Sequence, residues 1–157
     1  MGNEVKIVAW EDFFVTGITS IDNQHKGLVP LINTLYKACV DGDSTVDTAF
    51  REAMSKMVEY VRFHFTIELK FLKKIKYPFY NDHKSEHNVL INQILAAAEE
   101  YKTGKKFVPH TFARTLKDWV LSHIAVTDKL YAAYVAEQIK KGLLSVKEIE
   151  AIIAEGM

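Results

Sequence analysis

The chain has 157 residues, enough for one domain that buries roughly two thirds of its unfolded surface. Nearly half of the residues are apolar (48%) and a quarter are charged (25%), as in ordinary soluble proteins. Basic and acidic residues balance at 20 each, so nucleic acid is not an expected partner. No apolar stretch approaches the ~20 residues that span a bilayer, and the amino terminus lacks signal-peptide features. With Cys39 as the only cysteine, we expect a cytoplasmic protein with no membrane partner.

Residues 1–17 are expected to form an irregular arm held by aromatic side chains. These are Trp10, Phe13 and Phe14. Thr19 and Asp22 have the spacing of a capping box, which predicts a first helix from there to about Cys39. Pro30 lies inside that helix and predicts a kink, because proline lacks a backbone N–H and its ring clashes with the preceding turn. One face of this helix is apolar: Ile21, Leu28, Ile32, Leu35 and Cys39.

A turn is predicted at residues 41–44, where the sequence reads Asp-Gly-Asp-Ser. Ser44 and Asp47 then form a capping box for a second helix. This helix is expected to stop at Tyr77, because a residue before a proline avoids the helical conformation and Pro78 follows. Its apolar face contains Phe50, Met54, Met57, Val61, Phe65, Leu72 and Ile75.

The third helix is expected from about residue 79 to 102, and a loop follows at residues 104–109. Pro109 can open a fourth helix, which continues to about residue 141 and ends at Gly142. The inward residues of the third helix are predicted to be Leu90, Ile91, Ile94 and Leu95. Those of the fourth are Phe112, Leu116, Trp119, Val120, Ile124, Leu130, Tyr131 and Tyr134.

A short carboxy-terminal helix is predicted within residues 143–157, capped by Ser145 with Glu148. Its apolar residues are Val146, Ile149, Ile152 and Ile153. Four long helices joined by short loops predict an all-α protein, an antiparallel up-down four-helix bundle over residues 18–141. We expect residues 1–157 to form a single domain in which the tail packs on the bundle. The alternative is that the tail binds a protein partner or mediates self-association.

Five of the six histidines interrupt the predicted apolar faces: His25, His64, His83, His87 and His123. Residues four apart share one face of a helix, as His83 and His87 do, and as Glu68 does with His64. A single inward histidine is more often a hydrogen-bonded core residue than a ligand. Five buried imidazoles together would each need a hydrogen-bond acceptor, whereas a metal would use one lone pair of every ring. The remaining histidine, His110, is interpreted as a surface residue.

Imidazole with carboxylate and no thiolate suits iron, zinc or copper better than calcium or magnesium. Five histidines exceed one tetrahedral zinc site, so two adjacent metals are favoured. Glu68 and Asp128 are candidate bridges between them, because an inward carboxylate is costly without compensating charge. Asp128 follows His123 by five residues, about 140° around an ideal helix. We therefore predict a π-type irregularity within residues 124–127.

These motifs resemble the hemerythrin family over about Val8 to Tyr134. The matching motifs are His25 in Ile-Asp-Asn-Gln-His-Lys, His64-Phe65-x-x-Glu68, Tyr77-Pro78, His83-x-x-x-His87 and Trp119-x-x-x-His123-Ile124-x-x-x-Asp128. The resemblance implies two iron ions, one bound by His83, His87 and His123 and the other by His25 and His64. Glu68, Asp128 and an oxo or hydroxo group would bridge them.

The resemblance further implies reversible O2 binding at the iron with two histidines, for oxygen storage, transport or delivery, without enzymatic turnover. Small anions could occupy the oxidised site. The residues that match the family's O2 pocket are Leu28, Phe65, Trp119, Val120 and Ile124, with Val120 in place of an expected leucine. Three alternatives remain open: a sensor of O2 or redox state acting through a partner, a di-iron oxidase, peroxidase or nitric-oxide-handling protein, and a zinc or iron buffer.

Overall fold

The computed structural model describes residues 6–40, 46–103 and 109–157, and within these ranges all regular secondary structure is helical. The helices are α1 (Thr19–Val40), α2 (Val46–Lys74), α3 (Tyr80–Thr103), α4 (Pro109–Ser122), α5 (Asp128–Lys140) and α6 (Val146–Gly156). A 3-10 turn at Asp12–Phe14 interrupts the amino-terminal arm. A π-helical turn at His123–Thr127 joins α4 to α5, so that the two form one rod.

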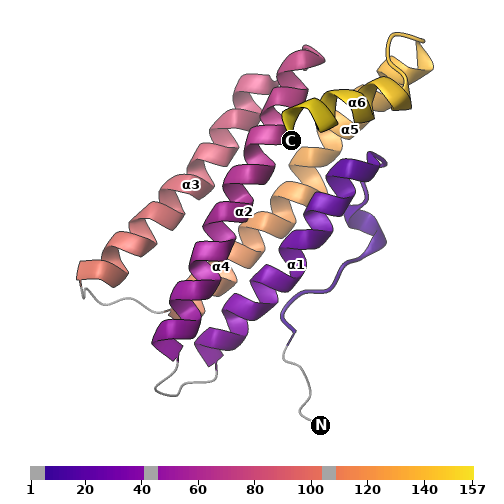
Figure 1. Ribbon diagram of the computed structural model, residues 1–157. Helices are drawn as coiled ribbons and strands as arrows, with labels where there is room; N and C mark the ends of the chain where they lie inside the picture. The colour runs from indigo at the N-terminus through magenta and orange to yellow at the C-terminus, as the bar shows by residue number, and fades with distance from the viewer. Residues whose placement is uncertain (1–5, 41–45, 104–108) are drawn as a thin grey trace.

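Successive rods run in opposite directions, as the alternating course of α1, α2, α3 and α4–α5 in Figure 1 shows. Helix α1 packs against α2 and α4, and α3 also packs against α2 and α4, which closes a four-helix bundle. The predicted all-α fold is confirmed. Helix α6 lies on α2 and α1, with Ile149 and Ile153 buried, so its expected packing on the bundle is confirmed as well. None of the helices in the described ranges combines the length and apolar character needed to cross a membrane.

The start of α1 differs from the predicted capping box. The Asp22 carboxylate accepts hydrogen bonds from the backbone N–H groups of Thr16 (2.8 Å) and Gly17 (3.1 Å), and from the Thr16 hydroxyl (2.7 Å). Gly17 has a φ of 87°, which suits glycine and turns the arm so that these donors reach Asp22. Thr19 is already the first helical residue, so the prediction that it caps the helix was wrong.

The other predicted helix ends have mixed outcomes. Ser145 caps α6 by accepting a hydrogen bond from the Glu148 N–H (3.1 Å), as expected. Gly142, which follows the C-cap residue Lys141 of α5, has a φ of 74° and so ends the fourth rod as predicted. The turn at 41–44, the Ser44 cap and the loop at 104–108 lie outside the described residues. Helix α1 is continuous through Pro30, and the kink there stays a prediction.

The buried core consists of two apolar clusters. We call the first the Leu35 cluster; it includes Leu28, Ile32, Leu35, Met57, Phe65, Leu90, Leu116, Val120 and Ile124. The second, the Ile153 cluster, includes Ile18, Ile21, Ile67, Phe71, Leu72, Tyr131, Val135, Ile149 and Ile153. Along α1, α2 and α4–α5, a set of buried polar residues falls where one cluster gives way to the other. The two apolar clusters therefore lie on either side of a layer of buried polar residues and keep water from it.

Some residues predicted to point inward are exposed. Leu130 is 59% exposed, because the π-helical turn adds a residue to the rod and rotates everything after it. Leu95 is 62% exposed, since α3 buries the face that contains Leu90 and Ile94. In the arm, Phe14 is buried whereas Phe13 is exposed, so only one of these neighbours is an anchor. Val146 in the first turn of α6 is exposed as well.

Gly27 and Tyr60 fix how closely α1 approaches α2. A Cβ added at Gly27 would overlap the Tyr60 phenol oxygen, so only glycine permits this contact. The Tyr60 hydroxyl donates a hydrogen bond to the backbone carbonyl of Gln24 (2.6 Å). This contact sets the separation of the two helices beside the polar layer.

Candidate metal centre

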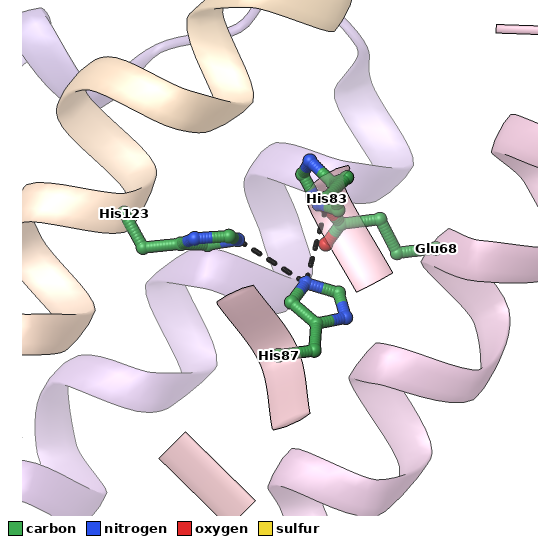
Figure 2. A group of neighbouring side chains, drawn as sticks. All are labelled: Glu68, His83, His87 and His123. Carbon is green, nitrogen blue, oxygen red and sulfur yellow. Dashed lines mark hydrogen bonds and ion pairs between the residues drawn. The ribbon is translucent and has the colours of Figure 1, made fainter. Parts of the chain in front are cut away.

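The seven residues predicted as metal ligands come together inside the bundle. They come from all four rods: His25 on α1, His64 and Glu68 on α2, His83 and His87 on α3, and His123 and Asp128 on the rod α4–α5. Each is at most 4% exposed. Their ligand atoms form two groups suited to holding a metal ion, and both groups contain Glu68. We call these the three-histidine group, drawn in Figure 2 (His83, His87 and His123), and the two-histidine group (His25 and His64).

Each carboxylate presents one oxygen to each group. Glu68 Oε1 lies 2.5 Å from His83 Nε2, whereas its Oε2 lies 2.7 Å from His64 Nε2. Asp128 Oδ1 lies 3.0 Å from His123 Nε2, whereas its Oδ2 lies 3.1 Å from His25 Nε2. Both carboxylates therefore span the two groups.

The histidine nitrogens are spaced like ligands of a shared ion. His25 Nε2 and His64 Nε2 are 3.2 Å apart, and His87 Nε2 and His123 Nε2 are 3.1 Å apart (Figure 2). Two ligands bound at about 2.1 Å and at right angles would lie about 3.0 Å apart. Both Asp128 oxygens are buried and lie 3.0–3.4 Å from imidazole nitrogens of His25, His83 and His123. A pair of cations fits this donor set, because buried anionic oxygens need compensating charge.

The charges of the cluster follow from burial and from its own neighbours. Burial raises the pKa of Glu68, but nearby His64 and His83 hold it well below its usual value. Burial and Glu68 raise the pKa of Asp128, but His123 and His25 outweigh them and leave it below its usual value. Both carboxylates are therefore anionic at neutral pH and supply two negative charges to the centre.

Two histidines in the three-histidine group differ sharply in basicity. Burial is the main cause that lowers the pKa of His87, to about 3. Burial also lowers the pKa of His123, but the charge and hydrogen bond of Asp128, together with Glu68, outweigh it and raise the value to about 9. Neutral His87 already has a free lone pair, whereas His123 must lose a proton before it can bind a metal.

The π-helical turn was predicted and is confirmed. The Asp128 N–H donates to the carbonyl of His123, five residues earlier, instead of the usual four. This wider turn brings both side chains to the same side of the rod, where Asp128 Oδ1 lies 3.0 Å from His123 Nε2. A regular helix would place them about 140° apart.

Aromatic side chains stack on two of the histidines. Phe65 lies flat on His87, with ring centroids 3.6 Å apart and planes at 5°. Trp119 lies on His123 at 4.6 Å and 11°. The other three residues predicted for an O2 pocket, Leu28, Val120 and Ile124, are buried in the Leu35 cluster with Phe65.

Two polar partners of the histidines were missed by the sequence analysis. The His64 Nδ1 lies 2.7 Å from Gln24 Oε1, and the His123 Nδ1 lies 2.9 Å from Glu86 Oε2. Gln24 and Glu86 each directly precede a candidate ligand on their own helix, but each contacts a histidine of a neighbouring helix. Helical period alone does not reveal such a contact. His110, read as a surface residue, is half-buried and its ring lies 5.5 Å from that of Tyr36.

The family model, the relatives and the solved structure that this chain matches all belong to one family. Residues 16–135 match the family model described as the hemerythrin HHE cation binding domain. A bacteriohemerythrin of Stenotrophomonas maltophilia is 28% identical over 137 residues, which cover 87% of this chain and 84% of that protein. One of Pseudomonas paraeruginosa is 30% identical and covers 79% of this chain and 78% of that protein.

A solved structure described as wild-type hemerythrin has the same fold. It superposes with a TM-score of 0.74 at 26% identity and covers 81% of this chain and 96% of that one. The family match begins just before α1 and ends within α5, so it includes all seven buried residues of the candidate metal centre. The chain therefore belongs to the hemerythrin family.

Proposed function

We propose that this protein holds two iron ions and binds O2 reversibly, with the seven buried residues as the ligands. The observation that carries the proposal is the division of each carboxylate between the two histidine groups. Two anionic bridges and five imidazoles suit a pair of adjacent ions in the family whose domain is described as cation-binding. An oxo or hydroxo group between the ions would complete the bridge.

The two groups offer different numbers of donors. The three-histidine group combines three nitrogens with one oxygen from each carboxylate, whereas the two-histidine group has one nitrogen fewer. We therefore assign the open position for O2 to the two-histidine group, beside His25 and His64. A small anion could occupy the same position in the oxidised protein.

Bound as a ferrous pair, the ions would supply the two electrons that reversible O2 binding requires. The chain's own contribution is to keep the site dry and its ligands fixed. Phe65 and Trp119 hold His87 and His123 by stacking, and Leu28, Val120 and Ile124 are buried in the same apolar cluster. We propose that these five side chains form the O2 pocket, because solvent access controls how readily such a centre oxidises.

We propose binding of O2 for storage, transport or delivery in preference to turnover. The donor set contains five imidazoles and two carboxylates, whereas ferritin-like di-iron proteins that use Glu-x-x-His motifs are carboxylate-rich. We further propose that residues 1–157 act as one domain, with the tail after Gly142 as part of it. The burial of Ile149 and Ile153 against the bundle supports this.

The test is an optical titration of the reduced, iron-loaded protein with O2 in an anaerobic cell. Reversible binding predicts a ligand-to-iron charge-transfer band that grows with O2 and disappears when O2 is removed. Cycling should recover the full band. Oxidation that does not reverse, with continued O2 consumption in the presence of a reductant, would instead indicate an enzyme.

The pocket assignment has its own test. Replacing Leu28 or Ile124 with Gln should speed autoxidation of the O2-bound protein, because a polar side chain admits water to the site. Leu95→Gln is the matched control, since Leu95 is exposed on α3. Equal autoxidation rates in all three variants would remove these residues from the pocket.

A further inference from the structure

Glu86 touches the metal centre from outside through a single oxygen. Its Oε2 lies 2.9 Å from His123 Nδ1, and it also accepts a hydrogen bond from the Thr127 hydroxyl (2.8 Å). His123 and Thr127 are the first and last residues of the π-helical turn, whereas Glu86 belongs to α3. One carboxylate oxygen thus holds both ends of the turn that carries a candidate ligand.

The His123 ring is constrained on three sides as a result. Trp119 stacks on its face, Glu86 meets Nδ1, and Nε2 points into the three-histidine group. With Nδ1 donating to a carboxylate, the proton stays on that nitrogen and the Nε2 lone pair is left for a metal. The other two histidines of the group lack such a partner among the described residues, since the Nδ1 atoms of His83 and His87 are unpaired there.

Solvent reaches Glu86 but hardly His123. The Glu86 side chain is 49% exposed and that of His123 is 3% exposed. A surface hollow of about 470 Å³ lies over this pair, and Trp119, Thr127 and Asp118 also line it. The Glu86 carboxylate is therefore hydrated while it contacts a buried ring, whereas a fully buried carboxylate would need a compensating partner.

We propose that Glu86 is a positioning residue: it sets the tautomer and donor strength of His123 and so the hold of the three-histidine group on its ion. The inference rests on the proposed iron site but not on O2 binding. An anionic partner makes an imidazole a stronger donor, which tightens the ion and favours its oxidised state. His64 has only a neutral amide, Gln24, at the equivalent nitrogen.

The experiment uses full-length protein loaded anaerobically with ferrous iron and then mixed with an iron(II) chelator. Glu86→Ala and Glu86→Gln should each release one of the two ions about 10- to 100-fold faster than the wild type. Thr127→Val keeps the His123 contact and should change release far less. Asp118→Asn is the matched control, because Asp118 is an exposed carboxylate in the same hollow.

The reduction potential separates this role from a purely structural one. In Glu86→Gln the potential should shift upward, because the neutral amide no longer stabilises the oxidised ion, and a purely structural contact would not produce such a shift. Iron release and potential in Glu86→Gln equal to those of the control would overturn the proposal. It would also be overturned if Thr127→Val released iron as fast as Glu86→Ala. The hold of Glu86 on the π-helical turn, and not its contact with His123, would then explain the faster release. Failure to bind O2 in the wild type would leave both readouts intact.

Discussion

The two histidine groups share their carboxylates but differ in how their rings are held. In the three-histidine group, His123 has a charged partner and a stacked indole, and His87 has a stacked phenyl ring. In the two-histidine group, His64 has a neutral amide partner, and His25 Nδ1 has none among the described residues. Under the proposed di-iron assignment, the three-histidine group would retain its ion more firmly, because the two-histidine group has fewer donors and weaker support. That division suits a centre in which only one ion accepts a ligand.

Removing a shared carboxylate should have the largest effect, because both groups lose a donor at once. Asp128→Ala should lower iron affinity by more than the roughly 100-fold loss typical of an outer partner. Elemental analysis after chelator dialysis measures the iron retained. Asp118→Ala serves as the control, since that aspartate is largely exposed. Full retention of both ions by Asp128→Ala would show that Asp128 does not bridge the groups.

Removing one histidine from one group at a time should show which group binds its ion more tightly. His25→Ala leaves the two-histidine group with a single imidazole, so we expect this variant to keep only the ion of the three-histidine group. His87→Ala leaves two imidazoles and both carboxylates in its group, so we expect weaker binding there but more iron per chain than in His25→Ala. The iron retained per chain at increasing chelator concentration shows which of the two variants binds iron more tightly. The reverse order would show that the two-histidine group is the tighter one.

The neutral partner of His64 can be replaced by a carboxylate of the kind that contacts His123. Gln24→Glu would give His64 the carboxylate partner that His123 has, at the 2.7 Å contact. Release of the weaker ion should slow. The apoprotein should lose about 1–3 kcal/mol of unfolding free energy, because Gln24 is buried and an anion there is poorly hydrated. Chelator kinetics and chemical denaturation measure the two effects. Unchanged release would show that the partner's charge is unimportant.

The sequence was sufficient to predict the elements that follow from periodicity and ligand spacing. The four rods, the seven buried donors and the irregular turn before Asp128 all follow from residues that recur three, four or five apart. The features that the sequence could not predict depend on contacts between helices. Glu86 and Gln24 lie on helix positions that give no sign of a neighbouring histidine. The exposure of Leu130 depends on how far a π-helical turn rotates the chain after it.

The smallest expected effect concerns protonation of the three-histidine group in the apoprotein. The pKa of His123 is raised to about 9, so its stabilising contribution is complete below about pH 6.5 and is lost as the pH rises through about 9. The pKa of His87 is lowered to about 3, so its neutral form contributes stability above about pH 6.5 that is lost as the pH falls. Denaturation of the apoprotein from pH 6 to 10 should show an alkaline loss that His123→Gln removes. If this loss persists in His123→Gln, then a charged His123 in the apoprotein, held by Asp128 and Glu86, is not its source.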